Sequence, residues 1–194
     1  MERKKLKHPF FVIIGPSGSG KTRVAEAVFP SEYKVISHTT RPIRKEEVEG
    51  ADYYFETEEG FQHLLNMNAL AEFDTYHGNQ YGVGIAELIQ KTTDHYAYDV
   101  LTFKGFQKIE EQFGNMIIPI FLDVSKKNVL SRLQTRENDT ILIKQRGALY
   151  TQESQNKNKI ITYPNHSIIN ANQPFEKVVK EVEQAVNERI KKLE

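Results

Sequence analysis

The chain contains no cysteine among its 194 residues. This absence excludes disulfide bonds, catalytic thiols and metal sites built from cysteine. An excess of charge of one sign is missing as well, because 26 basic residues balance 26 acidic ones. Without a global positive field a polyanion is not attracted, so we expect no nucleic-acid partner.

Long apolar runs are also missing. No run approaches the roughly 20 residues of a membrane-spanning helix, and we therefore expect no membrane partner. The first seven residues are mostly charged and lead into an expected strand, without the apolar segment of a secretory signal. These absences predict a cytoplasmic protein, whose 39% of hydrophobic residues suffices for an ordinary core.

Hydrophobic periodicity predicts an alternation of strands and helices. Strands are expected near residues 10–14, 34–37, 96–101, 117–122 and 167–170, and helices near 20–28, 57–66, 84–91, 104–113, 125–135 and 174–193. This alternation is typical of an α/β fold, a three-layer sandwich in which helices cover a mostly parallel core sheet. Ligands of such folds bind beyond the carboxyl ends of the strands.

Two regions interrupt the alternation. Residues 37–83 are rich in Tyr, Glu and Arg and are expected to form an insertion after the first helix. Residues 136–156 are mostly polar around a short apolar patch and are expected to form a mobile cover. We therefore expect one domain over residues 1–194, with a core at 8–34, 93–135 and 157–194, an insertion at 35–92 and a lid at 136–156.

The most informative stretch follows the first expected strand and matches the pattern Gly-x-x-x-x-Gly-Lys-[Ser/Thr]. Its residues are Gly15, Pro16, Ser17, Gly18, Ser19, Gly20, Lys21 and Thr22. The run before it is typical of a buried strand, and residues 23–29 after it are typical of a short amphipathic helix. In this setting the backbone N–H groups of the loop surround a phosphate.

The loop predicts a site for a nucleoside triphosphate. Lys21 would reach the β- and γ-phosphates, and the Thr22 hydroxyl would help to hold Mg²⁺. The N-terminus of the following helix adds partial positive charge. The alternative is a glycine-rich turn that binds nothing.

The expected insertion carries groups that suit a second phosphate and a base. Arg41 and Arg44 lie three positions apart around a proline, and Tyr53 and Tyr81 follow further on. A guanidinium is permanently charged and can bind two phosphate oxygens at once. A glutamate such as Glu72 can accept from both the ring N–H and the exocyclic amine of guanine. Taken singly, these residues could instead form a solvated turn with surface salt bridges.

Taken together, these stretches resemble the guanylate kinase family. Its pattern is a Gly-Pro-Ser-Gly-x-Gly-Lys-[Ser/Thr] loop, a Ser-x-Thr-Thr-Arg-x-x-Arg stretch, a Glu-Val-x-Gly-x-Asp-Tyr-x-Phe turn, and a Glu followed by Gly-Asn-x-Tyr-Gly. All four occur here in this order, and the likeness covers roughly residues 10 to 190.

The resemblance implies a P-loop fold in which the insertion binds a nucleoside monophosphate and the lid covers it. It implies Mg²⁺-dependent phosphoryl transfer from ATP to GMP or dGMP, which would be the small-molecule partners of a monomer or homodimer. The implied GMP ligands are Ser37, Arg41, Arg44, Tyr53, Glu72, Tyr81 and Asp99, with Glu72 at the guanine edge. The insertion and the lid would close over the two nucleotides.

Two of the departures from the family pattern concern the acceptor. Val83 stands where the family has a Ser or Thr whose hydroxyl helps to read the guanine. Asp99 stands alone where the family has Asp-x-Asp at the end of a strand. Asp99 could still orient Mg²⁺-bound water or the acceptor nucleotide, or it could cap the next helix.

Three further arginines, Arg132, Arg136 and Arg146, lie in and after an Arg-Leu-Gln-Thr-Arg stretch. By resemblance Arg132 would contact ATP, and the other two would close over the transferred phosphoryl group. With Lys21 and Arg44, Arg136 and Arg146 are the expected catalytic residues. An arginine that stabilises such a transition state is worth about 10³–10⁵ in rate. The alternative is that these arginines pair with carboxylates on an exposed helix.

Two other functions stay open at this point. The run Tyr81 to Gly84 with a single Asp99 also looks like the related ribose bisphosphate phosphokinases, whose acceptor has no base. A non-catalytic guanylate-kinase-like interaction module is the other alternative. Such modules characteristically lose loop and lid residues, whereas this chain keeps Lys21 and Thr22.

Overall fold

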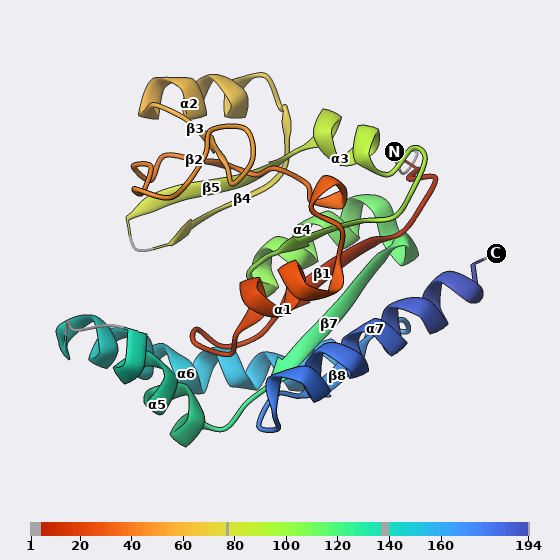
Figure 1. The fold of residues 1–194 in the computed structure, drawn as a ribbon. Helices are drawn as coiled ribbons and strands as arrows, with labels where there is room; N and C mark the ends of the chain where they lie inside the picture. Colours follow the sequence, from red (N-terminus) through yellow and green to blue (C-terminus); the bar gives the residue numbers. More distant parts are fainter. Residues whose placement is uncertain (1–4, 77, 137–139, 194) are drawn as a thin grey trace. The chain divides into compact units, whose positions relative to one another are not determined.

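The computed structural model describes residues 5–76, 78–136 and 140–193, and it does not describe the side chains at 135, 136, 140–142, 145 and 146. Figure 1 shows how the strands and helices follow one another. The strands are β1 (Phe10–Ile14), β2 (His38–Thr39), β3 (Tyr54–Phe55), β4 (Leu70–Tyr76), β5 (Asn79–Gly84), β6 (Ala97–Val100), β7 (Ile117–Asp123) and β8 (Ser167–Asn170). The α-helices are α1 (Lys21–Val28), α2 (Glu58–Asn66), α3 (Ile85–Lys91), α4 (Phe103–Phe113), α5 (Lys126–Arg136), α6 (Thr140–Ile160) and α7 (Phe175–Lys191).

The residues form two compact units. The first comprises Met1–Phe10, Glu32–Asp99 and Lys104–Ile117, and the second comprises Phe11–Ser31, Val100–Phe103 and Ile118–Glu194. The division into a core, an insertion at 35–92 and a lid at 136–156 stays a prediction. None of the helices in the described part of the chain has the length and apolar character needed to cross a membrane.

Four strands form the core sheet in the order β6-β1-β7-β8. Strands β7 and β8 run parallel, with Ile120 opposite Ser167. β1 is buried throughout, and β7 is buried at every position but its last. Continuous apolar runs of this kind belong to parallel strands that are covered on both faces. The predicted α/β fold with a parallel core sheet is confirmed.

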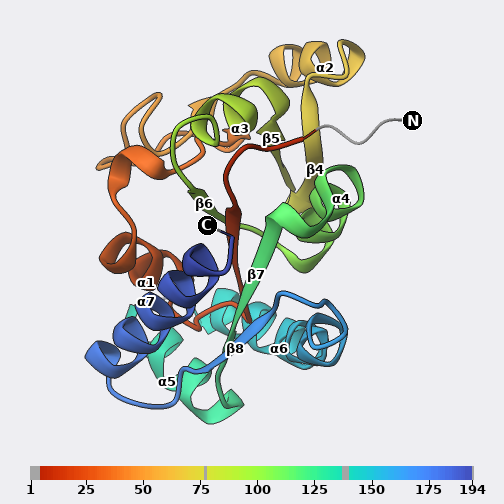
Figure 2. The same ribbon diagram turned by 90° about the vertical axis from the view of Figure 1, so that its right-hand side faces the viewer.

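Helix α7 buries an apolar stripe. Its buried residues Val178, Val182 and Val186 recur every four positions, as one face of a helix requires. The helix contacts α1 and β8, as Figure 2 shows. The guanidinium of Arg23 in α1 lies 4.2 Å from the ring centre of Phe175. The apolar stripe at this end of the chain is therefore a packing surface, as the sequence predicts.

A second, smaller sheet has the order β3-β2-β5-β4. Strand β2 is parallel to β3 and antiparallel to β5, and β4 and β5 form an antiparallel hairpin. Helix α2 covers one face of this sheet (Figure 1). Its fully buried Phe61 lies so close to Gly82 that a Cβ added there would be 3.2 Å from the ring. Glycine at position 82 therefore lets the helix approach the sheet.

The six expected helices all form, with ends that differ by at most two residues from the prediction. The expected strand at 34–37 is wrong. Lys34 forms only an isolated bridge with Tyr98, whereas the carbonyl of Ser37 accepts from the amide of Tyr54 in another strand. The segment changes partner within four residues, so no continuous ladder can form.

Two parts of the structure go beyond the sequence prediction. The stretch expected as a cover contains most of the 21-residue helix α6, which begins at Thr140 and continues to Ile160. The expected insertion contains strands β2 to β5, which the apolar pattern does not single out because they carry many polar residues. Both parts bear candidate site residues, so their structure decides how the site is arranged.

Candidate active site

The phosphate loop leaves β1 in close contact with the neighbouring strand. A Cβ added at Gly15 would lie 2.8 Å from the carbonyl oxygen of Leu122 in β7. Only a residue without a side chain fits such a close approach. Further along, Gly20 has φ +95 and is the N-cap of α1, a left-handed conformation that also favours glycine. Both glycines of the motif are thus required by the backbone path.

The start of α1 is suited to an anion. No acidic side chain lies in its first turn, and Gly20 offers no side chain to cap its N–H groups. Backbone N–H groups at a helix N-terminus and the helix dipole both favour negative charge at this end. Lys21 begins the helix, and its Nζ donates to the carbonyl oxygens of Gly15 at 2.7 Å and Pro16 at 3.0 Å. The ammonium is therefore held over the loop, with exposed Thr22 next to it.

Arg132 joins the loop to the segment after β8. Its guanidinium donates to the carbonyl oxygen of Ser19 at 3.0 Å and to that of Ala171 at 2.7 Å. Partial burial lowers the pKa of Arg132 from its usual value. The side chain predicted to contact ATP thus lies against the phosphate loop, where it fixes the loop's backbone.

The small sheet gathers most of the predicted acceptor residues on one face, here called the polar face. Side chains alternate between the two faces of a strand, and directly opposed residues share a face. In the strand register, Thr39 lies opposite both Phe55 and Tyr81. Tyr81 also lies opposite Asp74, and Glu72 lies opposite Val83. The polar face consists of Thr39, Phe55, Glu72, Asp74, Tyr81 and Val83 by register, together with Ser37 and Tyr53, which immediately precede β2 and β3 and lie two residues before Thr39 and Phe55. Helix α2 covers the other face, at Gly82.

Arg41 is held at this face by a carboxylate. Its two terminal nitrogens donate to the two oxygens of Glu47 at 2.9 and 2.7 Å. Its guanidinium also lies 5.4 Å from the ring centre of Tyr53. The hydrogen bond to Glu47 raises the pKa of Arg41, and Tyr81 adds a smaller effect in the same direction. The planar fork of Arg41 is therefore already arranged for a two-oxygen anion.

The two predicted tyrosines lie together. The ring centres of Tyr53 and Tyr81 are 6.0 Å apart, with the rings tilted by 69°. Burial raises the pKa of the Tyr53 hydroxyl, so this group stays a hydrogen-bond donor at neutral pH. The phenols and Arg41 together form a cluster of donors that suits phosphate oxygens.

Glu72 is a buried carboxyl group. Its exposed fraction is 5%, and its cross-strand neighbour Val83 is fully buried. Burial raises the pKa of Glu72 to about 8, with smaller and partly opposing effects of Lys108 and Asp99. The group is therefore mostly protonated at neutral pH until a ligand that donates hydrogen bonds stabilises its charge.

Ser37 and Asp99 form a second buried pair. The Ser37 hydroxyl donates to Oδ2 of Asp99 at 2.5 Å, and both residues are buried. Asp99 lies within β6, four residues before the first residue of α4, and its carboxylate also raises the pKa of Tyr53. The structure thus brings Asp99 to the predicted acceptor residues.

The remaining predicted residues are placed differently. The side chain of Arg44 is 67% exposed, and its nearest nitrogen lies 4.0 Å from Glu47, at the margin of the cluster. Arg136 ends α5 and Arg146 lies in α6, but both side chains are outside the described residues. Their predicted lid contacts therefore stay predictions.

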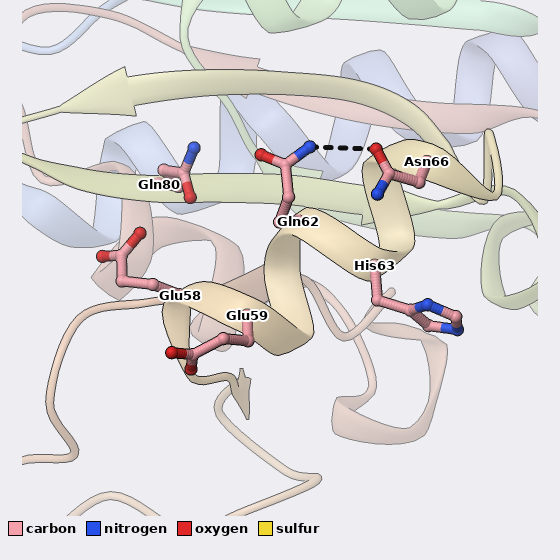
Figure 3. A pocket seen from close by; sticks show the side chains of 6 residues that line it. All are labelled: Glu58, Glu59, Gln62, His63, Asn66 and Gln80. Carbon is pink, nitrogen blue, oxygen red and sulfur yellow. Dashed lines mark hydrogen bonds between the residues drawn. The ribbon is translucent and has the colours of Figure 1, made fainter.

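A groove of about 550 Å³ lies beside α2, and Figure 3 shows the side chains that line it. It is lined by Glu58, Glu59, Gln62, His63, Asn66 and Gln80. Gln80 precedes Tyr81 in β5 and so belongs to the face that α2 covers. No predicted site residue lines this groove, and it is distinct from the polar face.

Comparison with known proteins supplies the family. The guanylate kinase family model matches residues 7–189. The chain belongs to the guanylate kinase family. Guanylate kinases of Wigglesworthia glossinidia brevipalpis and Coxiella burnetii are 29% and 33% identical to it over 193 and 157 residues. These alignments cover 96% and 76% of this chain and 90% and 74% of the relatives.

Solved structures of low sequence identity share the fold. The crystal structure of guanylate kinase from Anaplasma phagocytophilum matches with a TM-score of 0.66 at 22% identity, covering 96% of this chain and 88% of that one. A gluconokinase from Sinorhizobium meliloti 1021 matches with a TM-score of 0.55 at 14% identity, covering 98% and 97%. The family and the fold predicted from the sequence are therefore confirmed.

Two carboxylates at the candidate site carry no role in the sequence prediction. Glu47 lies within the quoted turn motif, three residues after Arg44, a spacing at which opposite charges often meet. That signal indicates Arg44, whose side chain lies 4.0 Å from Glu47, and not Arg41, the residue that Glu47 pairs with in the structure. Glu153 accepts a hydrogen bond from the amide of Ser17, 136 positions away. No sequence signal indicates this second contact.

Proposed function

We propose that the protein transfers the γ-phosphoryl group of ATP to GMP or dGMP, giving ADP and GDP or dGDP. One observation carries the proposal. The polar face combines a donor cluster around Arg41 with the buried carboxyl group of Glu72. A nucleoside monophosphate presents the matching groups, a phosphate and a base edge. We also propose that the protein works in the cytoplasm, where ATP is at hand as the phosphoryl donor.

In this proposal the phosphate loop binds the donor. Its backbone N–H groups and the N-terminus of α1 surround the phosphates. Arg132 holds the backbone of the loop through the carbonyl oxygen of Ser19 and lies next to the nucleotide. Lys21 exchanges its two carbonyl partners for the β- and γ-phosphate oxygens. Its charge then offsets the charge that builds up on the transferred group. Arg44, Arg136 and Arg146 are proposed to add charge as the lid closes.

The residues present fit a magnesium ion that arrives with the nucleotide. The described residues hold no group of three or more His, Asp or Glu side chains that could bind a metal ion. The Thr22 hydroxyl is exposed at the first turn of α1, beside the proposed phosphate site. Thr22 would therefore supply one ligand, and the phosphates and water the rest. Bound there, the ion neutralises charge on the phosphates.

In the same proposal the polar face binds the acceptor. Arg41 exchanges Glu47 for the phosphate of GMP, and the Tyr53 and Tyr81 hydroxyls donate to the same phosphate. Glu72 loses its proton and accepts from the ring N–H and the exocyclic amine of guanine. Ser37 and Asp99 contact the nucleotide between these two ends. Closure over both nucleotides excludes water from the reacting phosphate.

A coupled assay of ADP formation tests the proposal. ATP and Mg²⁺ are combined with GMP, dGMP, AMP, UMP or ribose bisphosphate in separate reactions. We expect GMP or dGMP to be the preferred acceptor. Preference for ribose bisphosphate would favour the related phosphokinases instead. The absence of GMP-dependent ADP formation at high enzyme concentration would refute the proposal.

A further inference from the structure

The phosphate loop contains a tight turn at Pro16–Ser19. The amide of Ser19 donates to the carbonyl oxygen of Pro16 at 3.0 Å. Gly18, the third residue of the turn, has φ +79, the value of a type II turn. A Cβ added at Gly18 would lie 3.2 and 3.3 Å from side-chain atoms of Leu133 and Val129 in α5. Apolar side chains therefore hold one side of the turn.

The other side of the turn is held by a single carboxylate. The amide of Ser17 donates to Oε2 of Glu153 in α6 at 2.7 Å. Within a β-turn the hydrogen bond joins the first and fourth residues, so the amide of the second residue needs a partner elsewhere. A hydrogen bond to a charged acceptor at this distance is among the stronger ones in proteins.

Glu153 is itself held between two contacts of the same helix. The Tyr150 hydroxyl donates to the carbonyl oxygen of Val124 at 2.7 Å, and Lys157 Nζ forms an ion pair with Asp123 Oδ2 at 2.5 Å. Positions 150, 153 and 157 share one helix face. Both contacts are to the carboxyl end of β7, beside which α6 runs in Figure 2. The carboxylate is thus placed by the packing of α6 and not by a flexible side chain alone.

We propose that Glu153 is a positioning residue of the phosphate loop: it holds the Pro16–Ser17 peptide by its N–H, and so orients the central Ser17–Gly18 peptide of the turn and sets the affinity for ATP phosphates. The orientation of this central peptide is what distinguishes type I from type II turns. It decides where the amide of Gly18 points, and the loop binds phosphate through such amides. The inference rests on the proposed function for the identity of the nucleotide.

The hydrogen bond and the charge of Glu153 have opposite effects on ATP. The hydrogen bond orders the loop before the nucleotide arrives, whereas the negative charge repels phosphate. Two variants separate them. Glu153→Gln keeps an oxygen that can accept from Ser17 but removes the charge, and Glu153→Ala removes both. Ser154→Ala is the matched control, because the Ser154 hydroxyl donates within its own helix, to the carbonyl oxygen of Thr151 at 3.0 Å.

The test measures ATP binding to the full chain by calorimetry, and the KM values for ATP and GMP. For Glu153→Ala we expect ATP affinity to fall and its KM to rise by about tenfold, the loss expected for one charge-assisted hydrogen bond. The KM for GMP should stay within twofold. For Glu153→Gln we expect ATP affinity within about threefold of the parent, and for Ser154→Ala no change. Rescue by glutamine identifies positioning through the hydrogen bond.

Several outcomes would overturn the inference. Tighter ATP binding in both Glu153 variants would show that the carboxylate competes with phosphate. Equal losses for ATP and GMP would show a general structural role. If the alanine variant does not fold, the hydrogen-exchange rate of the Ser17 amide is measured in Glu153→Gln instead. Faster exchange together with unchanged ATP affinity would contradict a positioning role. Failure of the parent protein to bind ATP would instead refute the proposed function.

Discussion

The phosphate loop and the polar face build their candidate sites from different parts of the chain. The loop uses eight consecutive residues, 15–22, whose backbone amides and glycine conformations make the anion site. The polar face uses side chains from Ser37 to Val83, which four strands and their neighbours bring together, and Asp99 joins it through its hydrogen bond with Ser37. The first site depends on local backbone geometry, and the second depends on sheet register.

The two sites also satisfy their charged groups differently. In the loop, Lys21 is held by carbonyl oxygens of the loop itself. On the polar face, Arg41 is held by the carboxylate of Glu47, and Glu72 is buried beside a valine. In the proposed function a ligand at the loop replaces these carbonyl oxygens on Lys21, whereas a ligand at the polar face displaces one carboxylate and ionises another. We expect acceptor binding to be the more sensitive to pH and to substitution of single charges.

Removal of the loop's ammonium should have the largest effect. In Lys21→Ala we expect turnover to fall by about 10³-fold or more, because this charge is proposed to offset the charge of the transferred group. GMP binding measured by calorimetry should be unchanged. Lys127→Ala, at an exposed position of α5, serves as the control. Loss of GMP binding in Lys21→Ala would show that the two sites are not separate.

Removal of the buried carboxyl group of Glu72 should weaken the acceptor site and leave the ATP site unchanged. In Glu72→Ala we expect the KM for GMP to rise by about 100-fold, the loss of two hydrogen bonds to a charged group. The KM for ATP should stay within twofold. Glu59→Ala, in α2 beside the groove of Figure 3, is the control. Equal increases for ATP and GMP would contradict the role of Glu72 at the base.

A conservative change at the donor cluster should have a smaller effect. Arg41→Lys keeps the positive charge but loses the planar fork that binds two oxygens. We expect the KM for GMP to rise by about tenfold while the KM for ATP is unchanged. Arg189→Lys in α7 provides the matched exchange outside both sites. A lysine that binds GMP as well as arginine does would show that charge alone is needed.

The smallest expected effect is the contribution of Glu72 to the pH dependence of the free energy of unfolding. Its pKa is raised from 4.5 to about 8 in the folded chain. A raised pKa means that the folded state binds the extra proton, so this stabilisation is full below pH 4.5 and is lost as pH rises through 8. Glu72→Gln lacks this dependence. Urea unfolding checks this: from pH 5.5 to pH 8.5 the free energy of unfolding of the parent should fall by roughly 1 kcal/mol or more relative to that of Glu72→Gln. The same difference between parent and variant at both pH values would contradict the burial of an ionisable group.

The phosphate-loop motif with its strand and helix could be predicted from the sequence because its determinants are local, whereas its contact with Glu153 could not. Strand, glycines, lysine and helix are consecutive, and each has its own sequence signal. The polar face was predicted by resemblance, without its strands. The polar residues of β4 and β5 obscure the alternation, and the partner change at Lys34 to Ser37 cannot be read from one segment. Sheet register depends on contacts between segments that are far apart in the chain.

The amino-acid sequence by itself determined the α/β fold, the family and the phosphate loop, because apolar periodicity and a contiguous motif encode them. Only the tertiary structure decided which groups hold the charged residues before a ligand binds. The pairing of Arg41 with Glu47, the burial of Glu72 beside Val83 and the contact of Glu153 with Ser17 all arise from packing. Such contacts form where elements that are far apart in the chain meet in the fold, and the spacing of residues along the chain does not encode which elements meet.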